Sequence, residues 1–64
     1  MKASELRELK PEELLKKENE LREDVFRMRM KLATGELEDT SMIKRTKKDI
    51  ARIKTILKEK EAEA

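Results

Sequence analysis

Apolar residues recur every three or four positions along two long stretches of the chain. In residues 11–33 they lie on one face of a helix, interrupted only by Glu18: Leu14, Leu21, Val25, Met28 and Leu32. In residues 41–60 the same spacing joins Ile43, Thr46, Ile50, Ile53 and Leu57, and Ala51 and Ile56 widen the stripe. Such spacing is typical of helices rather than strands. The pattern predicts two long helices, each with one apolar face.

A short connection at residues 34–40 joins these helices, which is typical of antiparallel neighbours. We therefore expect an all-α fold: an antiparallel two-helix hairpin, with helices at about 11–33 and 41–60. A short N-terminal helix, with Ser4 as its candidate cap, carries Leu6 and Leu9 and is expected to fold against the hairpin. Residues 1–64 form a single domain in this interpretation.

Residues at the predicted helix ends support these boundaries. Pro11 suits the first turn of a helix, and Gly35, the only glycine in the chain, suits the left-handed position that closes one. The candidate N-caps of the second long helix are Asp39, Thr40 and Ser41. The apolar spacing is lost after Lys58, so residues 59–64 are predicted to be a frayed tail.

Composition narrows the function. Half of the 64 residues are charged, cysteine and histidine are absent, and Phe26 is the only aromatic residue. The chain offers no nucleophile paired with a base and no glycine-rich phosphate loop, and it lacks the clustered ligands of a metal site. No apolar run reaches the length of a membrane span or of a signal peptide core. We predict a cytoplasmic protein that is not an enzyme and has no cofactor, metal or small-molecule substrate.

The net charge of +2 is unevenly distributed along the chain. Residues 1–26 carry six basic and eight acidic side chains, whereas residues 27–58 carry ten basic and four acidic ones. Within the second helix, Arg45, Lys48 and Arg52 share one face that is not the apolar one. A charged stripe is usually a solvated surface, but the shortage of nearby acidic residues favours an anionic partner. Because stacking residues are nearly absent, recognition of folded RNA by shape is favoured over base readout.

Two methionines and the single phenylalanine leave alternatives open. Met28 lies on the apolar face and is interpreted as core, whereas Met30 and Phe26 lie beside it and are either buried in part or exposed at a contact with protein or RNA. Gly35 either closes the first long helix or lets the backbone approach RNA, and we favour helix closure.

Several stretches carry a resemblance to a known family. Residues 26–39 (FRMRMKLATGELED), 43–45 and 47–55 (KKDIARIKT), preceded by residues 1–9 and 11–14, resemble the large-subunit ribosomal protein L29 family of bacteria. The resemblance implies a structural constituent of the large ribosomal subunit that binds ribosomal RNA near the polypeptide exit tunnel. It also implies two kinds of protein neighbour there, ribosomal protein L23 and nascent-chain factors.

The candidate RNA contacts lie in the inter-helix turn and the second helix. Carried over by position, the main candidates are Arg29, Thr34, Gly35, Arg45, Lys48 and Arg52, with Lys44, Lys47 and Lys54 as secondary phosphate contacts. The alternative function is a helical-hairpin module that self-associates or docks on a protein, without specific RNA binding. Its contact surface would use the apolar edges at Leu15, Phe26 and Ile56.

Overall fold

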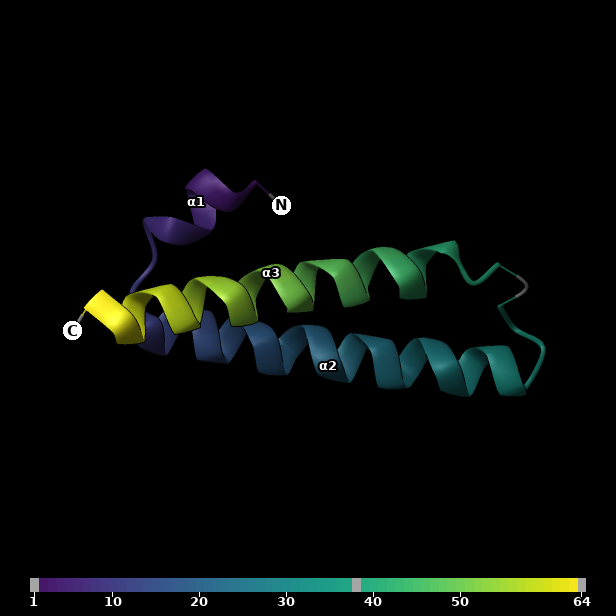
Figure 1. Ribbon diagram of the computed structural model, residues 1–64. Coiled ribbons are helices and arrows are strands. Elements are labelled where there is room, and N and C mark those ends of the chain that lie inside the picture. The colour runs from purple at the N-terminus through teal and green to yellow at the C-terminus, as the bar shows by residue number, and fades with distance from the viewer. Residues whose placement is uncertain (1, 38, 64) are drawn as a thin grey trace.

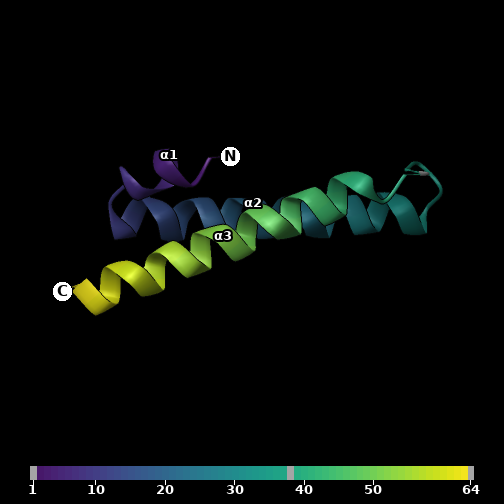
Figure 2. The same cartoon turned by 45° about the horizontal axis from the view of Figure 1, so that its top comes forward.

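The computed structural model describes residues 2–37 and 39–63, which form the helices α1 (Ala3–Arg7), α2 (Pro11–Ala33) and α3 (Ser41–Glu63). The two long helices run side by side in opposite directions, and α1 lies near the end of the hairpin away from the inter-helix turn (Figure 1). Turned by 45°, the view shows α3 crossing α2 at an angle (Figure 2). The molecule is a rod of 45 × 17 × 15 Å. The predicted all-α hairpin with a short N-terminal helix is confirmed.

Both ends of α2 are as the sequence predicts. Pro11 occupies the first turn, where its missing N–H costs no hydrogen bond, and the helix ends at Ala33. Gly35 takes the left-handed conformation with φ +80°. The Lys31 carbonyl accepts the Glu36 N–H at 2.8 Å and the Leu32 carbonyl accepts the Gly35 N–H at 3.2 Å. This pair of bonds is the Schellman motif, so Gly35 closes α2, as the favoured interpretation had it.

The start of α3 is held by an aspartate ahead of its first turn. The Asp39 carboxylate accepts the Ser41 backbone N–H at 2.9 Å and the Ser41 hydroxyl at 2.8 Å. These two hydrogen bonds, aided by the charge of Lys44, lower the pKa of Asp39 below its usual value of 3.8. Among the three predicted candidates, Asp39 therefore supplies the side-chain cap, while Thr40 contributes its carbonyl to Lys44 N–H at 3.2 Å.

The core lies where all three helices meet. Leu6 of α1, Leu14 of α2 and both Ile53 and Ile56 of α3 form one buried cluster. Further toward the turn, the side chains buried between α2 and α3 are Val25, Ile43 and Thr46. The Thr46 hydroxyl donates to the Met42 carbonyl at 2.8 Å, so this buried polar group is satisfied. Met28 is half-buried, in agreement with its interpretation as core.

The N-terminal region differs in detail from the prediction. Lys2, not Ser4, occupies the N-cap position of α1, and no side-chain cap is made there. Ile56, predicted as an open apolar edge, is 2% exposed because α1 covers it. Ala51, predicted at the edge of the apolar stripe, is exposed.

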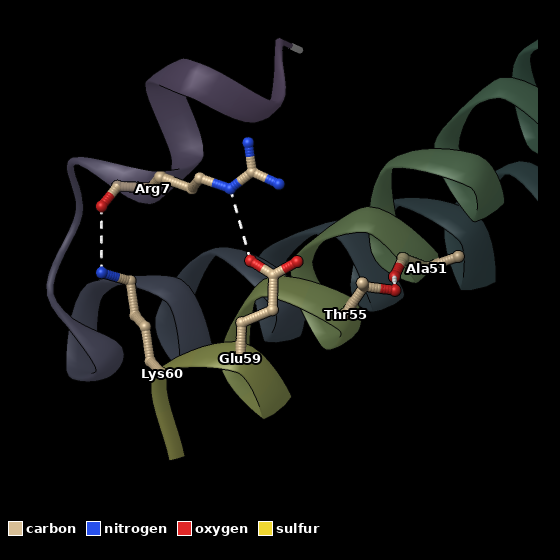
Figure 3. A network of polar contacts seen from close by, with 5 residues as sticks. All are labelled: Arg7, Ala51, Thr55, Glu59 and Lys60. Carbon is tan, nitrogen blue, oxygen red and sulfur yellow. Dashed lines mark hydrogen bonds and ion pairs between the residues drawn. The ribbon is translucent and has the colours of Figure 1, made fainter. Parts of the chain in front are cut away.

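The end of α3 also extends beyond its predicted limit near residue 60. The helix continues to Glu63 through most of the stretch predicted to be a frayed tail, and Ala64 lies outside the described residues. Arg7 Nε contacts Glu59 Oε2 at 3.3 Å, and Lys60 Nζ donates to the Arg7 carbonyl at 2.9 Å (Figure 3). These contacts join the last turns of α3 to α1. They are polar, so the spacing of apolar residues does not indicate them.

Candidate nucleic-acid interface

The nine residues predicted to contact RNA are all exposed, and the hairpin distributes them over three surfaces. Arg45, Lys48 and Arg52 form a basic stripe along α3, and Lys44 lies one turn before Lys48. Arg29, Lys47 and Lys54 lie along a groove between α2 and α3. Thr34 and Gly35 belong to the turn, at the end of the rod opposite α1 (Figure 1). The structure therefore gathers the cations into two groups and leaves the turn apart from both.

The basic stripe (Arg45, Lys48 and Arg52) continues onto α1. Arg52 lines a shallow depression of about 230 Å³ together with Arg7, Ala51 and Thr55. Ala51 and Thr55 are small, and the Thr55 hydroxyl donates to the Ala51 carbonyl at 3.0 Å (Figure 3). Arg7 adds a cation that the sequence analysis missed, because only the packing of α1 onto α3 brings it here.

A second surface, which we call the cationic groove, has a volume of about 340 Å³ between the long helices. Its lining includes Arg22, Phe26, Arg29, Lys47, Ile50 and Lys54. The α2 members follow the spacing i, i+4, i+7 and the α3 members follow i, i+3, i+7, so each helix contributes one continuous row. The antiparallel packing of α2 and α3 joins the two rows, and this is why Arg29 faces cations that are distant in sequence.

Ion pairs neutralise some arginines of α2 and not others. Arg27 contacts Glu23 at 3.7 Å and Asp24 at 3.6 Å, and Arg22 contacts Glu18 at 3.5 Å. Among residues 2–37 and 39–63, no ion pair is formed by the groove cations Arg29, Lys47 and Lys54. In the basic stripe, Arg52 lies 3.9 Å from Asp49. Arg45 and Lys48 of the stripe likewise form no ion pair within the described residues, so each basic surface keeps cations that no acidic side chain neutralises.

The turn contributes backbone and hydroxyl groups rather than charge. Thr34 Oγ1 donates to the Lys31 carbonyl at 3.1 Å, and Gly35 takes part in the Schellman motif. A Cβ added at Gly35 would have no atom within 4 Å, so the glycine is required here by its positive φ and not by crowding. Within the protein alone, both residues have a complete structural explanation.

Other kinds of site find no support in the described part of the chain. There, no group of three or more acidic, histidine or cysteine residues is arranged to hold a metal ion. No helix described in the structure is long and apolar enough to cross a membrane. What the arrangement offers is two rows of cations on a rigid rod, which suits an anionic polymer.

The chain is similar to proteins of one family over nearly its whole length. The family described as Ribosomal L29 protein matches residues 4–60. The large ribosomal subunit protein uL29 of Clostridium acetobutylicum is 55% identical over 64 residues, covering 100% of this chain and 96% of that protein. The uL29 of Clostridioides difficile is 53% identical over 60 residues, covering 94% and 90%. The uL29 of Geobacillus stearothermophilus is 50% identical over 64 residues, covering 100% and 97%.

Proposed function

Because the chain belongs to the ribosomal protein L29 family, whose members are structural and non-enzymatic components of the large ribosomal subunit, we propose that it binds ribosomal RNA directly through its two basic surfaces. The protein therefore acts on the ribosome, in the cytoplasm. The basic stripe (Arg45, Lys48 and Arg52) and the cationic groove supply the phosphate contacts in this proposal, and Thr34 and Gly35 supply contacts from the turn.

The observation that carries the proposal is the uncompensated charge of the groove. Arg29, Lys47 and Lys54 make no ion pair in the described parts of the chain, although residues 1–64 contain nearly as many acidic as basic side chains. A surface whose charges served solubility alone would intersperse both signs, as Arg27 does with Glu23 and Asp24. A row of unneutralised cations gains free energy when phosphates replace its counterions.

We further propose that the protein lies near the polypeptide exit tunnel, beside ribosomal protein L23, where nascent-chain factors dock. The resemblance that implies this position covers residues on α2, the turn and α3. Exposed apolar side chains support contact with protein neighbours as well as with RNA, since Leu15 is 51% and Met30 is 55% exposed.

The proposal is tested by binding the purified chain to folded large-subunit ribosomal RNA and to an unrelated structured RNA over a range of salt concentrations. We expect a preference for the ribosomal RNA that persists at physiological salt. The variant Arg45→Ala/Lys48→Ala/Arg52→Ala should bind more weakly while keeping its helical content, because all three side chains are exposed. A matched control is Lys10→Ala/Lys16→Ala/Lys17→Ala, which removes the same charge from the acidic half of the chain.

Two results would contradict the proposal. The first is equal binding to both RNAs that is lost at physiological salt, which would mean that the basic surfaces attract any RNA without specificity. Equal weakening in the stripe variant and in its charge-matched control would show that net charge, and not the stripe, governs binding. Either result would favour the protein-docking alternative, although Ile56, one of its predicted contact residues, is covered by α1.

A further inference from the structure

Phe26 is the most exposed large apolar side chain among those that the structure describes. It is 65% exposed, compared with 55% for Met30 and 51% for Leu15. Phe26 is not among the buried core residues, whereas the adjacent Val25 is 8% exposed and belongs to the core. Such an exposed apolar side chain is typical of a contact with a binding partner.

The surroundings of Phe26 define what such a partner must carry. Arg22 and Arg29 flank it on α2, and Lys47 and Lys54 face it from α3 across the cationic groove. Arg22 is four residues before Phe26 and Arg29 is three residues after it, so each lies about one helical turn from the ring along α2. The groove thus combines one aromatic face with several positive charges, three of which make no ion pair in the described residues.

We propose that the cationic groove receives an unpaired nucleotide of the ribosomal RNA, with the base stacked on Phe26 and the flanking phosphates beside Arg29, Lys47 and Lys54. This inference rests on the proposed function and names the part of the RNA that the groove binds. A nucleotide carries a flat apolar face and a negative charge within one unit, which matches the groove in both respects. The paired bases of a duplex offer no such face, because stacking and pairing bury it.

A protein partner matches the groove less well. An acidic segment would satisfy the cations but would leave the Phe26 ring against charged groups. An aliphatic segment would cover the ring but would bury Arg29, Lys47 and Lys54 without partners, which desolvates each charge without compensation. A nucleotide supplies planar stacking and charge neutralisation within one unit.

The test uses two substitutions at Phe26 in the full chain. Phe26→Leu keeps an apolar side chain and removes the aromatic face, whereas Phe26→Trp enlarges that face. Because Phe26 lies outside the core, both variants should retain the parent's helical content and melting temperature. We expect Phe26→Leu to bind folded large-subunit ribosomal RNA at least about fivefold more weakly, and Phe26→Trp to bind at least as tightly as the parent.

Fluorescence gives a direct readout of stacking. The chain contains no tryptophan, so Phe26→Trp introduces a single reporter at the groove. Its emission should be quenched on addition of the ribosomal RNA and should change little on addition of a fully paired RNA duplex at a concentration where the duplex is bound. The matched control is Leu15→Ala, which removes another exposed apolar side chain of α2 and should leave RNA affinity unchanged.

The outcomes separate this inference from the proposed function. Failure of the parent chain to prefer ribosomal RNA would overturn the proposed function and this inference with it. Preferential binding by the parent, with Phe26→Leu binding equally well and the tryptophan reporter unquenched, would overturn this inference alone. In that case Phe26 would be assigned to a contact with a protein neighbour on the ribosome.

Discussion

At the scale of single residues, Gly35 is the position where backbone conformation dictates the amino acid. Its φ of +80° lies in the left-handed region, and an added Cβ would contact nothing within 4 Å. We therefore expect Gly35→Ala to lower the free energy of unfolding by about 1 kcal/mol through backbone strain alone. In a domain of this size, the melting temperature should fall by about 4–8 °C, measurable by circular dichroism.

The comparison that identifies backbone strain is Gly35→Asn. Asparagine tolerates the left-handed region better than alanine, so this variant should lose less stability despite its larger side chain. If Gly35→Ala melted with the parent, or if asparagine were the more harmful substitution, the explanation through φ would be wrong.

Asp39 provides a residue-level prediction of pH dependence. Hydrogen bonds from Ser41 lower the pKa of this carboxyl in the folded protein, so the folded state favours the ionised form. Its contribution to stability is therefore fully present above the unfolded pKa of about 3.8 and is lost as the pH falls through the lower folded pKa. We expect the stability difference between the parent and Asp39→Asn to shrink below about pH 4.

This prediction is checked by urea unfolding of both proteins between pH 7 and pH 2.5. Comparing the two proteins at each pH removes the contributions of the other carboxyl groups, which both chains share. A stability difference that stayed constant over this range would contradict the role of the Asp39 charge. Titration of the Asp39 carboxyl by nuclear magnetic resonance gives its pKa independently.

At the scale of elements, α1 docks through the buried Leu6, with Ala3 packed against the same cluster, and through polar contacts of Arg7. Leu6 is 2% exposed within the cluster that contains Leu14 and Ile56, and Arg7 contacts Glu59 and Lys60. The Arg7–Glu59 pair is exposed, so burial of Leu6 supplies most of the docking free energy. We expect Leu6→Ala to lower the free energy of unfolding by roughly 2–4 kcal/mol, measured by urea denaturation.

The control for this prediction is Leu15→Ala, which makes the same chemical change at a position 51% exposed. It should alter stability by less than about 0.5 kcal/mol. Equal losses in the two variants would mean that Leu6 contributes no more than an exposed side chain, and that α1 is not docked in solution.

The helices themselves were predictable because their signals are local. Pro11 and Gly35 mark the ends of α2, and the spacing of apolar residues marks the packed faces of both long helices. Packing of α1 against the hairpin was expected from its apolar residues, but its contacts with α3 were not, since they join residues more than fifty positions apart in sequence. For the same reason, burial of Ile56 and continuation of α3 beyond residue 60 to Glu63 required the three-dimensional structure.

At the scale of the whole molecule, the sequence predicts a basic stripe on one helix but not a surface to which two helices contribute. Charge counting found Arg45, Lys48 and Arg52, which lie on one helix. The grouping of Arg29 with Lys47 and Lys54 depends on the register between α2 and α3, which the periodicity of each helix leaves undetermined. The sequence alone did not indicate Phe26 as a stacking site, because a lone aromatic residue is a weak signal. Phe26 becomes a candidate only when the structure places it in the same groove as Arg29, Lys47 and Lys54.

The two basic surfaces lead to a prediction about the whole rod. If the basic stripe and the cationic groove bind phosphates in one complex, the dependence of log affinity on log salt contains a contribution from each. Replacing Arg45, Lys48 and Arg52 by alanine should make the slope shallower by about three, as should replacing Arg29, Lys47 and Lys54. Combining both sets should therefore change the slope by about six, because phosphate contacts made separately add.

The measurement is equilibrium binding to folded large-subunit ribosomal RNA between low and physiological salt, with the variant Lys10→Ala/Lys16→Ala/Lys17→Ala as the charge-matched control. If only one surface met the RNA, its variant would account for the whole change and the second set of substitutions would add nothing. If the control changed the slope as much as either set, the contacts would not be localised. Additive slopes with a silent control would mean that RNA meets the hairpin on both sides of α3 at once, so that the rod lies within folded RNA rather than on its surface.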